Sequence, residues 1–203
     1  LGDIIRADRS LIGLSAIMKR SGFRNDGSYM HGLMIKEPHN PEYNDDYEFI
    51  DTMRRIDNGN KRFEYGTEIR QESVAELKEF LAECKRRRIH VSAFLPPYAH
   101  AVHEKMRSME GRYEYIWKLH SEISPVFEKY GYKIQDYSDM SVLGAGDEEA
   151  LDGFHGSEKA YLRLWLKMQG QDTILRQFSD DQKKLESVLN ESQNPLLLFP
   201  GIR

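Results

Sequence analysis

The sequence predicts an α/β fold with a parallel sheet, and two observations carry this prediction. Between residues 71 and 168, segments with the apolar spacing of helices alternate with short apolar segments, in the order helix, strand, helix, strand, helix. That rhythm is typical of a parallel sheet covered by helices. The 203 residues, 39% of them hydrophobic, are enough for one domain, or one and a fraction.

The first part of the chain predicts little regular structure. Apolar side chains at helical spacing predict a helix over residues 6–19. Residues 21–44 are rich in Gly, Asn, Asp, His and Pro, which favour turns, and predict a long loop. A loop of more than about 12 to 15 residues in a compact domain is usually functional or disordered. A short helix over residues 47–57 and a turn-rich break over residues 59–66 follow.

The second half contains the clearest helical patterns. Residues 71–88 carry an apolar stripe that includes Cys84, and the basic residues at the end of this segment suit the negative end of a helix dipole. Helical spacing returns after residue 112 and is stopped by Gly131, because glycine readily adopts the left-handed conformation that ends helices. Helices are therefore predicted over residues 71–88, 112–130, 157–168 and 179–190.

Two short segments predict strands. Residues 90–95 have the length and apolar content of a buried strand, and Pro96 must end it because proline donates no hydrogen bond to a ladder. Residues 132–137 predict the second strand. Catalytic and binding groups of an open α/β sheet lie at the carboxyl ends of its strands. The loops at 96–103 and 136–155 are therefore the candidate site.

Composition excludes several classes of site. With 29 Lys and Arg against 33 Asp and Glu, the net charge is −4, which offers no basic surface for nucleic acid. The single cysteine, Cys84, excludes an intrachain disulfide and any metal site held by several thiolates, and its place on an apolar stripe predicts a small core residue. No segment approaches the roughly 18 apolar residues of a membrane span, the longest candidate being residues 195–200. We expect no cofactor and no metal.

Asp152 and His155 form the strongest candidate pair. They are three residues apart on a turn just before a predicted helix. That spacing lets a carboxylate reach Nδ1 of the imidazole and fix its tautomer, so that Nε2 can act as a general base for a hydroxyl nucleophile. The helix N-terminus disfavours the imidazolium and keeps the ring basic. We expect the imidazole to face a cleft bordered by residues 96–103.

Five segments in a fixed order carry a family resemblance. They are a helix, a strand ending in Phe94-Leu95-Pro96-Pro97-Tyr98, a helix with Trp117-Lys118, a strand ending in Asp136-Tyr137-Ser138, and Asp152-Gly153-Phe154-His155. In this order, from about residue 49 to residue 168, the chain resembles the SGNH (GDSL-like) hydrolase superfamily. It is most similar to the bacterial envelope branch related to carbohydrate O-acetylation and D-alanyl transfer proteins. The resemblance implies a three-layer α/β/α, flavodoxin-like fold and gives Asp152 and His155 two places in a Ser-His-Asp triad.

The resemblance also shows what this sequence lacks. The family nucleophile lies in a Gly-Asp-Ser block after the first strand, whereas Gly2-Asp3 is followed here by Ile4. The resemblance therefore implies that the first strands and the serine precede Leu1. Residues 1–170 would then be the C-terminal part of the domain, and residues 171–203 a helical extension.

The implied activity is that of an esterase or O-acyltransferase acting on esters of carbohydrate or cell-envelope polymers. The long loop, residues 21–46, is expected to border the site. The expected location is the cell envelope outside the cytoplasm, where a segment upstream of Leu1 could tether the protein. The candidate substrate-binding residues are Asn25, Gly27, Tyr98 and His100.

Alternatives remain open at this stage. The protein could be a non-catalytic member of the same fold, a binding or assembly module in envelope polysaccharide production. It could also be a metal-binding protein, although the spacing indicates no third ligand for His100 and His103. Tyr29 or Tyr98 could stack on carbohydrate. The loop candidates for a metal site are His31, His39, Asp45 and Asp46, and the serines without a nucleophile-elbow context are Ser10, Ser15 and Ser28.

Overall fold

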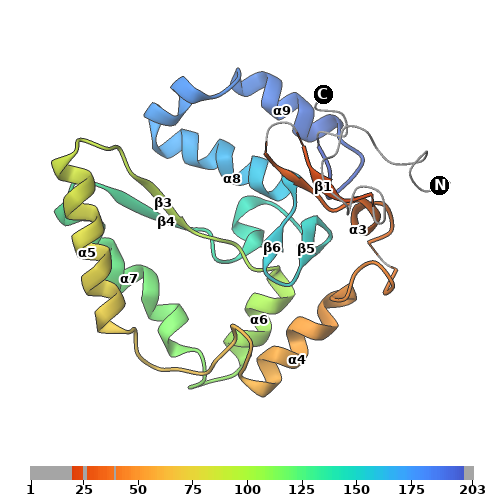
Figure 1. The fold of residues 1–203 in the computed structure, drawn as a ribbon, viewed down its shortest axis with the longest axis horizontal. Helices are drawn as coiled ribbons and strands as arrows, with labels where there is room; N and C mark the ends of the chain where they lie inside the picture. The colour runs from red at the N-terminus through yellow and green to blue at the C-terminus, as the bar shows by residue number, and fades with distance from the viewer. Residues whose placement is uncertain (1–19, 25–26, 39, 199–203) are drawn as a thin grey trace.

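The fold is mixed α/β, as the sequence predicts (Figure 1). The computed structural model describes residues 20–24, 27–38 and 40–198, so the helix predicted over residues 6–19 lies outside the described residues. Within this part, the strands form three two-stranded sheets. These are antiparallel β1 (Gly22–Phe23) and β2 (Tyr29–Met30), parallel β3 (Ser92–Leu95) and β4 (Lys133–Asp136), and antiparallel β5 (Ala150–Asp152) and β6 (His155–Gly156).

Helices make up most of the regular structure. The α-helices are α3 (Gly32–Lys36), α4 (Ile50–Asn58), α5 (Gln71–Arg86), α6 (His100–Ser108), α7 (Glu114–Lys129), α8 (Glu158–Gln171) and α9 (Gln182–Glu191). Short 3₁₀ helices are η1 (Tyr47–Phe49), η2 (Met140–Leu143), η3 (Asp147–Glu149) and η4 (Thr173–Phe178). The predicted helices around α4, α5, α7, α8 and α9 and both predicted strands are confirmed.

Two predictions of loop structure are wrong in part. The segment 21–46 contains β1, β2 and α3, because Gly27 takes a φ of 85° and lets the chain turn back between the two strands. The segment after β3, which was predicted to be a loop, forms α6. Its only strong apolar pattern in the sequence is the pair Val102 and Met106, four residues apart. Both are fully buried in the fold, and tertiary burial of this kind stabilises helices too short to form alone.

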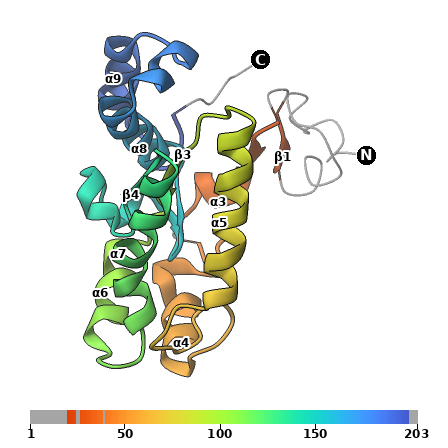
Figure 2. The same cartoon turned by 90° about the vertical axis from the view of Figure 1, so that its left-hand side faces the viewer.

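The parallel pair forms the centre of the molecule's α/β unit. β3 and β4 pair in register from Ser92 with Lys133 to Leu95 with Asp136, and the chain between them forms α6 and α7. α7 ends where Gly131 takes a φ of 78°, as expected from the sequence. Figure 2 shows α5 and α7 running along this pair, with α4 and α6 near one end of the molecule and α8 and α9 near the other.

Two apolar clusters hold these elements together. One packs α5 and α7 against the parallel pair and contains Leu81, Cys84 and Phe127, so Cys84 is a core residue as predicted. The other surrounds the loops after β3 and β4 and contains Tyr113, Met140 and residues of α4, α6 and α8. No helix within the described residues is long and apolar enough to cross a membrane.

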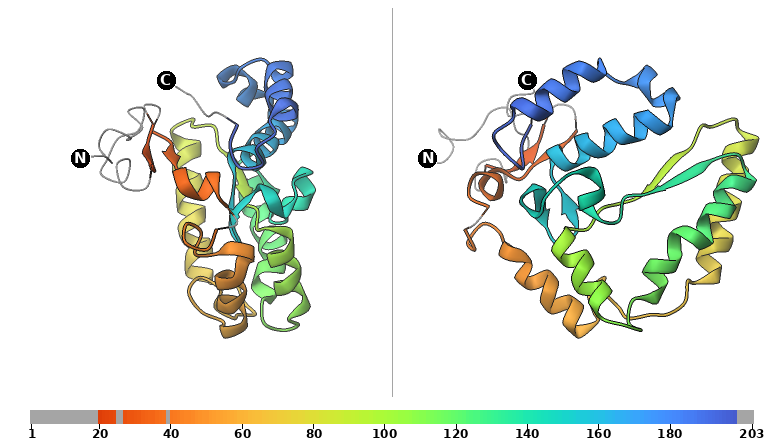
Figure 3. Two further views of the ribbon diagram at one scale, coloured as in Figure 1. Left: turned by 90° about the vertical axis from the view of Figure 1, so that its right-hand side faces the viewer. Right: turned by 180° about the vertical axis from the view of Figure 1, so that it is seen from behind.

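The β5–β6 hairpin lies beyond the carboxyl ends of β3 and β4. Ala99, just after β3, donates its backbone N–H to the carbonyl of Gly153 at 3.1 Å, and Tyr98 donates to Ser138, just after β4, at 2.9 Å. Figure 3 shows from two further sides that the hairpin lies between the start of α6 and α8. The turn with Asp152 and His155 is thus held at the edge where an α/β sheet carries its site.

Candidate functional site

Asp152 and His155 are in direct contact across the tight turn of the β5–β6 hairpin. Asp152 Oδ2 lies 2.8 Å from His155 Nδ1, and Asp152 Oδ1 accepts the backbone N–H groups of Phe154 and His155 at 2.9 and 2.8 Å. The carboxylate therefore closes its own turn and orients the ring at the same time. Within the described residues, Nε2 of His155 makes no hydrogen bond, and the side chain is 54% exposed. This arrangement leaves Nε2 available as an acceptor.

Asp46 braces this turn from the opposite side. Its carboxylate accepts hydrogen bonds from the backbone N–H of Gly153 at 2.9 Å and from the Thr52 backbone N–H and hydroxyl at 2.7 and 2.5 Å. Thr52 is fully buried at the start of α4. Gly153 is required here, because a Cβ at this position would lie 2.4 Å from Thr52 Cγ2. Sequence reasoning offered Asp46 only as a metal ligand, and no spacing signal could have shown this bracing role.

A small cavity of about 180 Å³ lies beside the hairpin. Phe154 forms one wall, and Pro96, Pro97 and Tyr98 from the end of β3 form another, together with Arg62 and Phe63. His155 contacts the outer side of this wall, since its ring centroid lies 4.3 Å from that of Phe154. Residues 96–98 of the expected cleft, 96–103, therefore line a cavity, but His155 is not among its lining residues.

Besides Asp46, the segment 21–46 makes a contact with the start of α8 and another with the hairpin. The buried Arg24 forms an ion pair with Glu158 in the first turn of α8, three residues after His155, with a Nη1 to Oε1 distance of 2.5 Å. The side-chain amide of Asn44 donates to the carbonyl of Leu151, next to Asp152, at 3.4 Å. These contacts place parts of the segment next to the hairpin and the start of α8.

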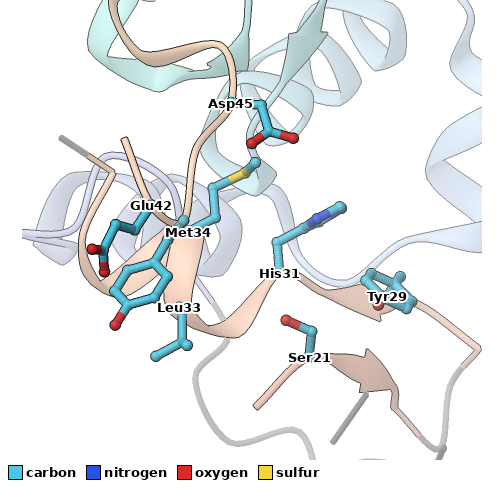
Figure 4. A pocket seen from close by; sticks show the side chains of 8 residues that line it. Ser21, Tyr29, His31, Leu33, Met34, Glu42 and Asp45 are labelled. Carbon is cyan, nitrogen blue, oxygen red and sulfur yellow. The ribbon is translucent and has the colours of Figure 1, made fainter. Parts of the chain in front are cut away.

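His31 is another residue of this segment. It is half-buried, and burial lowers its pKa below the usual value of 6.5; the Asp152 carboxylate opposes this shift and His155 adds to it. His31 also lines a pocket of about 420 Å³ between β1, β2, α3 and the turn before η1 (Figure 4). The sequence pointed to His31 only as a possible metal ligand.

The candidate substrate-binding residues are not gathered in one place. Tyr98 lines the small cavity, where burial raises the pKa of its hydroxyl. Gly27 lies at the exposed turn between β1 and β2, and Asn25 lies outside the described residues. His100 begins α6 and lies with Nδ1 at 3.1 Å from both oxygens of Asp139. Of the three described residues, Tyr98 shares a cavity wall with Phe154 of the Asp152–His155 hairpin.

A second histidine cluster surrounds Asp139. The hydrogen bond to Asp139 raises the pKa of His100. Burial alone would raise the pKa of Asp139, but hydrogen bonds from Ser141 and His100 outweigh it and lower that pKa. The buried His103 lies with Nδ1 at 3.9 Å from Asp139 and 3.5 Å from Glu104. In the part of the chain that the structure describes, no three His, Cys, Asp or Glu side chains are arranged to hold a metal ion. His39 lies outside that part.

Comparison with known proteins adds no relative. No protein-family model, no curated protein and no solved structure matches this chain.

Proposed function

We propose that this chain is the C-terminal part of an SGNH-like esterase or O-acyltransferase acting on esters of carbohydrate or cell-envelope polymers outside the cytoplasm. Its nucleophile would be a serine outside this sequence, and its fold the three-layer α/β/α arrangement of that superfamily. The observation that carries the proposal is the 2.8 Å contact between Asp152 Oδ2 and His155 Nδ1 at the carboxyl ends of β3 and β4.

In this proposal, His155 acts as the general base. Asp152 accepts the Nδ1 proton and thereby fixes the tautomer in which Nε2 carries a lone pair. Nε2 takes the proton of the serine hydroxyl as the oxygen attacks the ester carbonyl, and returns that proton to the leaving alcohol oxygen. An acyl-serine remains, which water or an acceptor hydroxyl then attacks by the same proton transfers in a second half-reaction.

The small cavity fits the acyl part of such an ester. Its walls are apolar, with Phe63, Phe154 and two prolines, and about 180 Å³ suits a short acyl group rather than a long chain. Phe154 contacts both this cavity and the imidazole of His155. A short acyl chain held here would have to reach past Phe154 to bring its ester carbonyl to a serine within hydrogen-bond distance of Nε2.

The test compares two histidines that both pair with an aspartate. The protein is extended with the sequence upstream of Leu1, and hydrolysis of a nitrophenyl acetate ester is measured. His155→Ala should lower kcat/KM by about 10²- to 10⁴-fold, the usual contribution of a positioned general base. His90→Ala is the matched control, because His90 contacts Asp172 with Nε2 at 2.5 Å from Oδ2, at the opposite end of the parallel pair. It should leave the rate within about twofold.

The unextended chain gives a second measurement. Without the serine it should hydrolyse the ester no faster than its own His155→Ala variant. Turnover by the unextended chain would show that the nucleophile is misplaced, and Ser28→Ala would be tested next. An extended protein that binds envelope polysaccharide but shows no loss of hydrolysis with His155→Ala would favour the non-catalytic module.

A further inference from the structure

A pocket of about 420 Å³, formed by the segment 21–45, has no role in the proposed reaction. Its walls come from three segments: Tyr29 on β2, His31 and Met34 at the start of α3, and the turn with Glu42, Tyr43 and Asp45 (Figure 4). The ion pair of Arg24 with Glu158 and the amide contact of Asn44 with Leu151 hold these segments against the start of α8 and the hairpin. The segments that form the pocket therefore lie against the elements that carry Asp152 and His155, although neither residue lines the pocket.

The walls combine aromatic faces with acceptor groups. Tyr29 and Tyr43 are 41% and 36% exposed, so part of each ring is open to a ligand. Tyr29 is held edge-on between Phe23 and His31, with ring centroids 5.1 and 4.9 Å apart. A fixed aromatic face and an apolar side chain such as Met34 offer contact to the C–H face of a sugar ring, and carboxylates accept hydrogen bonds from its hydroxyl and amine groups.

Apart from His31, the titratable charges that line the pocket are negative. Glu42 and Asp45 are both exposed, and neither forms an ion pair among the described residues. The described lining contains no Lys or Arg. His31, whose pKa burial lowers, adds no stable positive charge at neutral pH. A uronate or phosphodiester unit would therefore meet repulsion here, whereas an ammonium group would meet two unpaired carboxylates.

We infer that this pocket binds a hexosamine unit with a free, protonated amine, and that it holds the sugar chain beside the Asp152–His155 pair. The carboxylates of Glu42 and Asp45 attract the ammonium, and the sugar ring lies on Tyr43. The statement that the bound chain is the substrate rests on the proposed function; the binding itself does not. The pocket thus selects an aminated glycan over an anionic polymer.

The experiment is a calorimetric titration of the 203-residue chain with three tetrasaccharides. The probes are β-1,4-linked glucosamine, its N-acetylated form and galacturonic acid. The buffer is at about pH 6, below the roughly 7.7–8.0 expected for an α-amine, so the glucosamine probe is cationic. We expect the glucosamine probe to bind more tightly than its N-acetylated form by about two- to fivefold for each exposed carboxylate, and the galacturonate probe to bind worst. This preference should shrink as salt is added.

Isosteric variants of Asp45 and Glu42 test whether their negative charges bind the amine. Asp45→Asn and Glu42→Gln should each weaken the glucosamine probe by about two- to fivefold and leave the N-acetylated probe unchanged. Tyr43→Ala should weaken both probes, because it removes a ring face rather than a charge. The control is Glu110→Gln, which removes an exposed carboxylate between α6 and α7, outside the pocket, and should change neither affinity.

Several results would overturn the inference: no measurable binding of any probe, galacturonate binding as tightly as glucosamine, or equal losses for both probes in Asp45→Asn. The outcome is separable from that of the ester test. His155→Ala should bind the glucosamine probe like the wild type, because His155 does not line the pocket. Binding that persists while the ester test fails would refute the proposed reaction alone.

Discussion

Two pairs of histidine and aspartate lie on the loops that follow the parallel strands, and their local geometry is nearly the same. In each pair, Nδ1 of the histidine faces the carboxylate, at 2.8 Å for Asp152–His155 and 3.1 Å for Asp139–His100. The histidine side chains are 54% and 48% exposed, and the carboxylates 20% and 16%. Distance and exposure therefore do not decide which pair is suited to catalysis.

The surroundings of the two carboxylates differ. Asp152 uses its second oxygen on the backbone of its own turn, and that turn is braced by Asp46 and borders the small cavity of about 180 Å³. Asp139 is shared by His100 and Ser141 and lies within 3.9 Å of His103. His100 begins α6, where the helix dipole alone would disfavour its charged form, yet the hydrogen bond to Asp139 raises its pKa. Asp139 thus ties the start of α6 to the loop after β4, and we expect the Asp152–His155 pair, beside the small cavity, to supply the base.

The largest expected effect is a difference in kcat/KM between variants of the two pairs. In the extended protein, Asp152→Asn should lower kcat/KM for the nitrophenyl ester by about 10²- to 10⁴-fold, because the amide no longer fixes the tautomer or stabilises the imidazolium. Asp139→Asn should lower it by less than about threefold. If Asp139→Asn costs as much as Asp152→Asn, the comparison is wrong and His100 belongs to the reaction.

A stability control distinguishes chemistry from folding in this experiment. His155 is a surface residue, so His155→Ala should change the free energy of unfolding by no more than about 0.5 kcal/mol. Urea unfolding of the same variants measures this. A much larger loss would mean that the histidine is structural, and that the lost activity reports unfolding.

The next effect tests how tightly the Asp152–His155 turn is braced. Gly153→Ala places a Cβ 2.4 Å from a Thr52 side chain that is fully buried, and should destabilise the fold by about 1–3 kcal/mol through overpacking. Gly170→Ala is the matched control, since no atom lies within 4 Å of its added Cβ and the residue lies in α8. It should be neutral or stabilise by up to about 1 kcal/mol. Equal stabilities for the two variants in urea would show that the turn is not braced by Thr52.

The sequence predicts the elements whose pattern is local. α5, α7 and α8 show apolar side chains at helical spacing, and β3 ends where Pro96 removes the donor, so each was predicted from its own residues. The Asp152–His155 contact is also local, because three residues on a tight turn place the two side chains together. Because so few residues separate Asp152 and His155, the chain has little freedom to place their side chains in any other arrangement.

The remaining parts depend on contacts that no local pattern encodes. Asp46 and Gly153 are 107 residues apart, and Arg24 and Glu158 are 134 apart, so neither the brace nor the docking of β1 and β2 could be inferred from spacing. α6 forms around two residues that only the assembled core buries. His31 looked like an isolated loop histidine because Arg24 and Asn44, which hold its segment against the hairpin, have no sequence signature.

The smallest expected effect concerns the pH dependence of the Asp139–His100 pair. The pKa of His100 is raised from 6.5, so its contribution to stability is complete below pH 6.5 and is lost as the pH rises through the raised value. The pKa of Asp139 is lowered from 3.8, so its contribution is present above pH 3.8 and is lost as the pH falls through the lowered value. The difference in unfolding free energy between the wild type and His100→Ala should therefore be largest between about pH 3.8 and 6.5. It should stay below about 1 kcal/mol, because His100 is half exposed and solvent screens the pair.

Urea unfolding at a series of pH values measures the difference, with Asp139→Asn as the background in which the His100→Ala effect should vanish. A difference that does not change with pH, or one that grows above pH 8, would show that His100 is not held as a cation by Asp139, and the two pairs would again be equal candidates for the base.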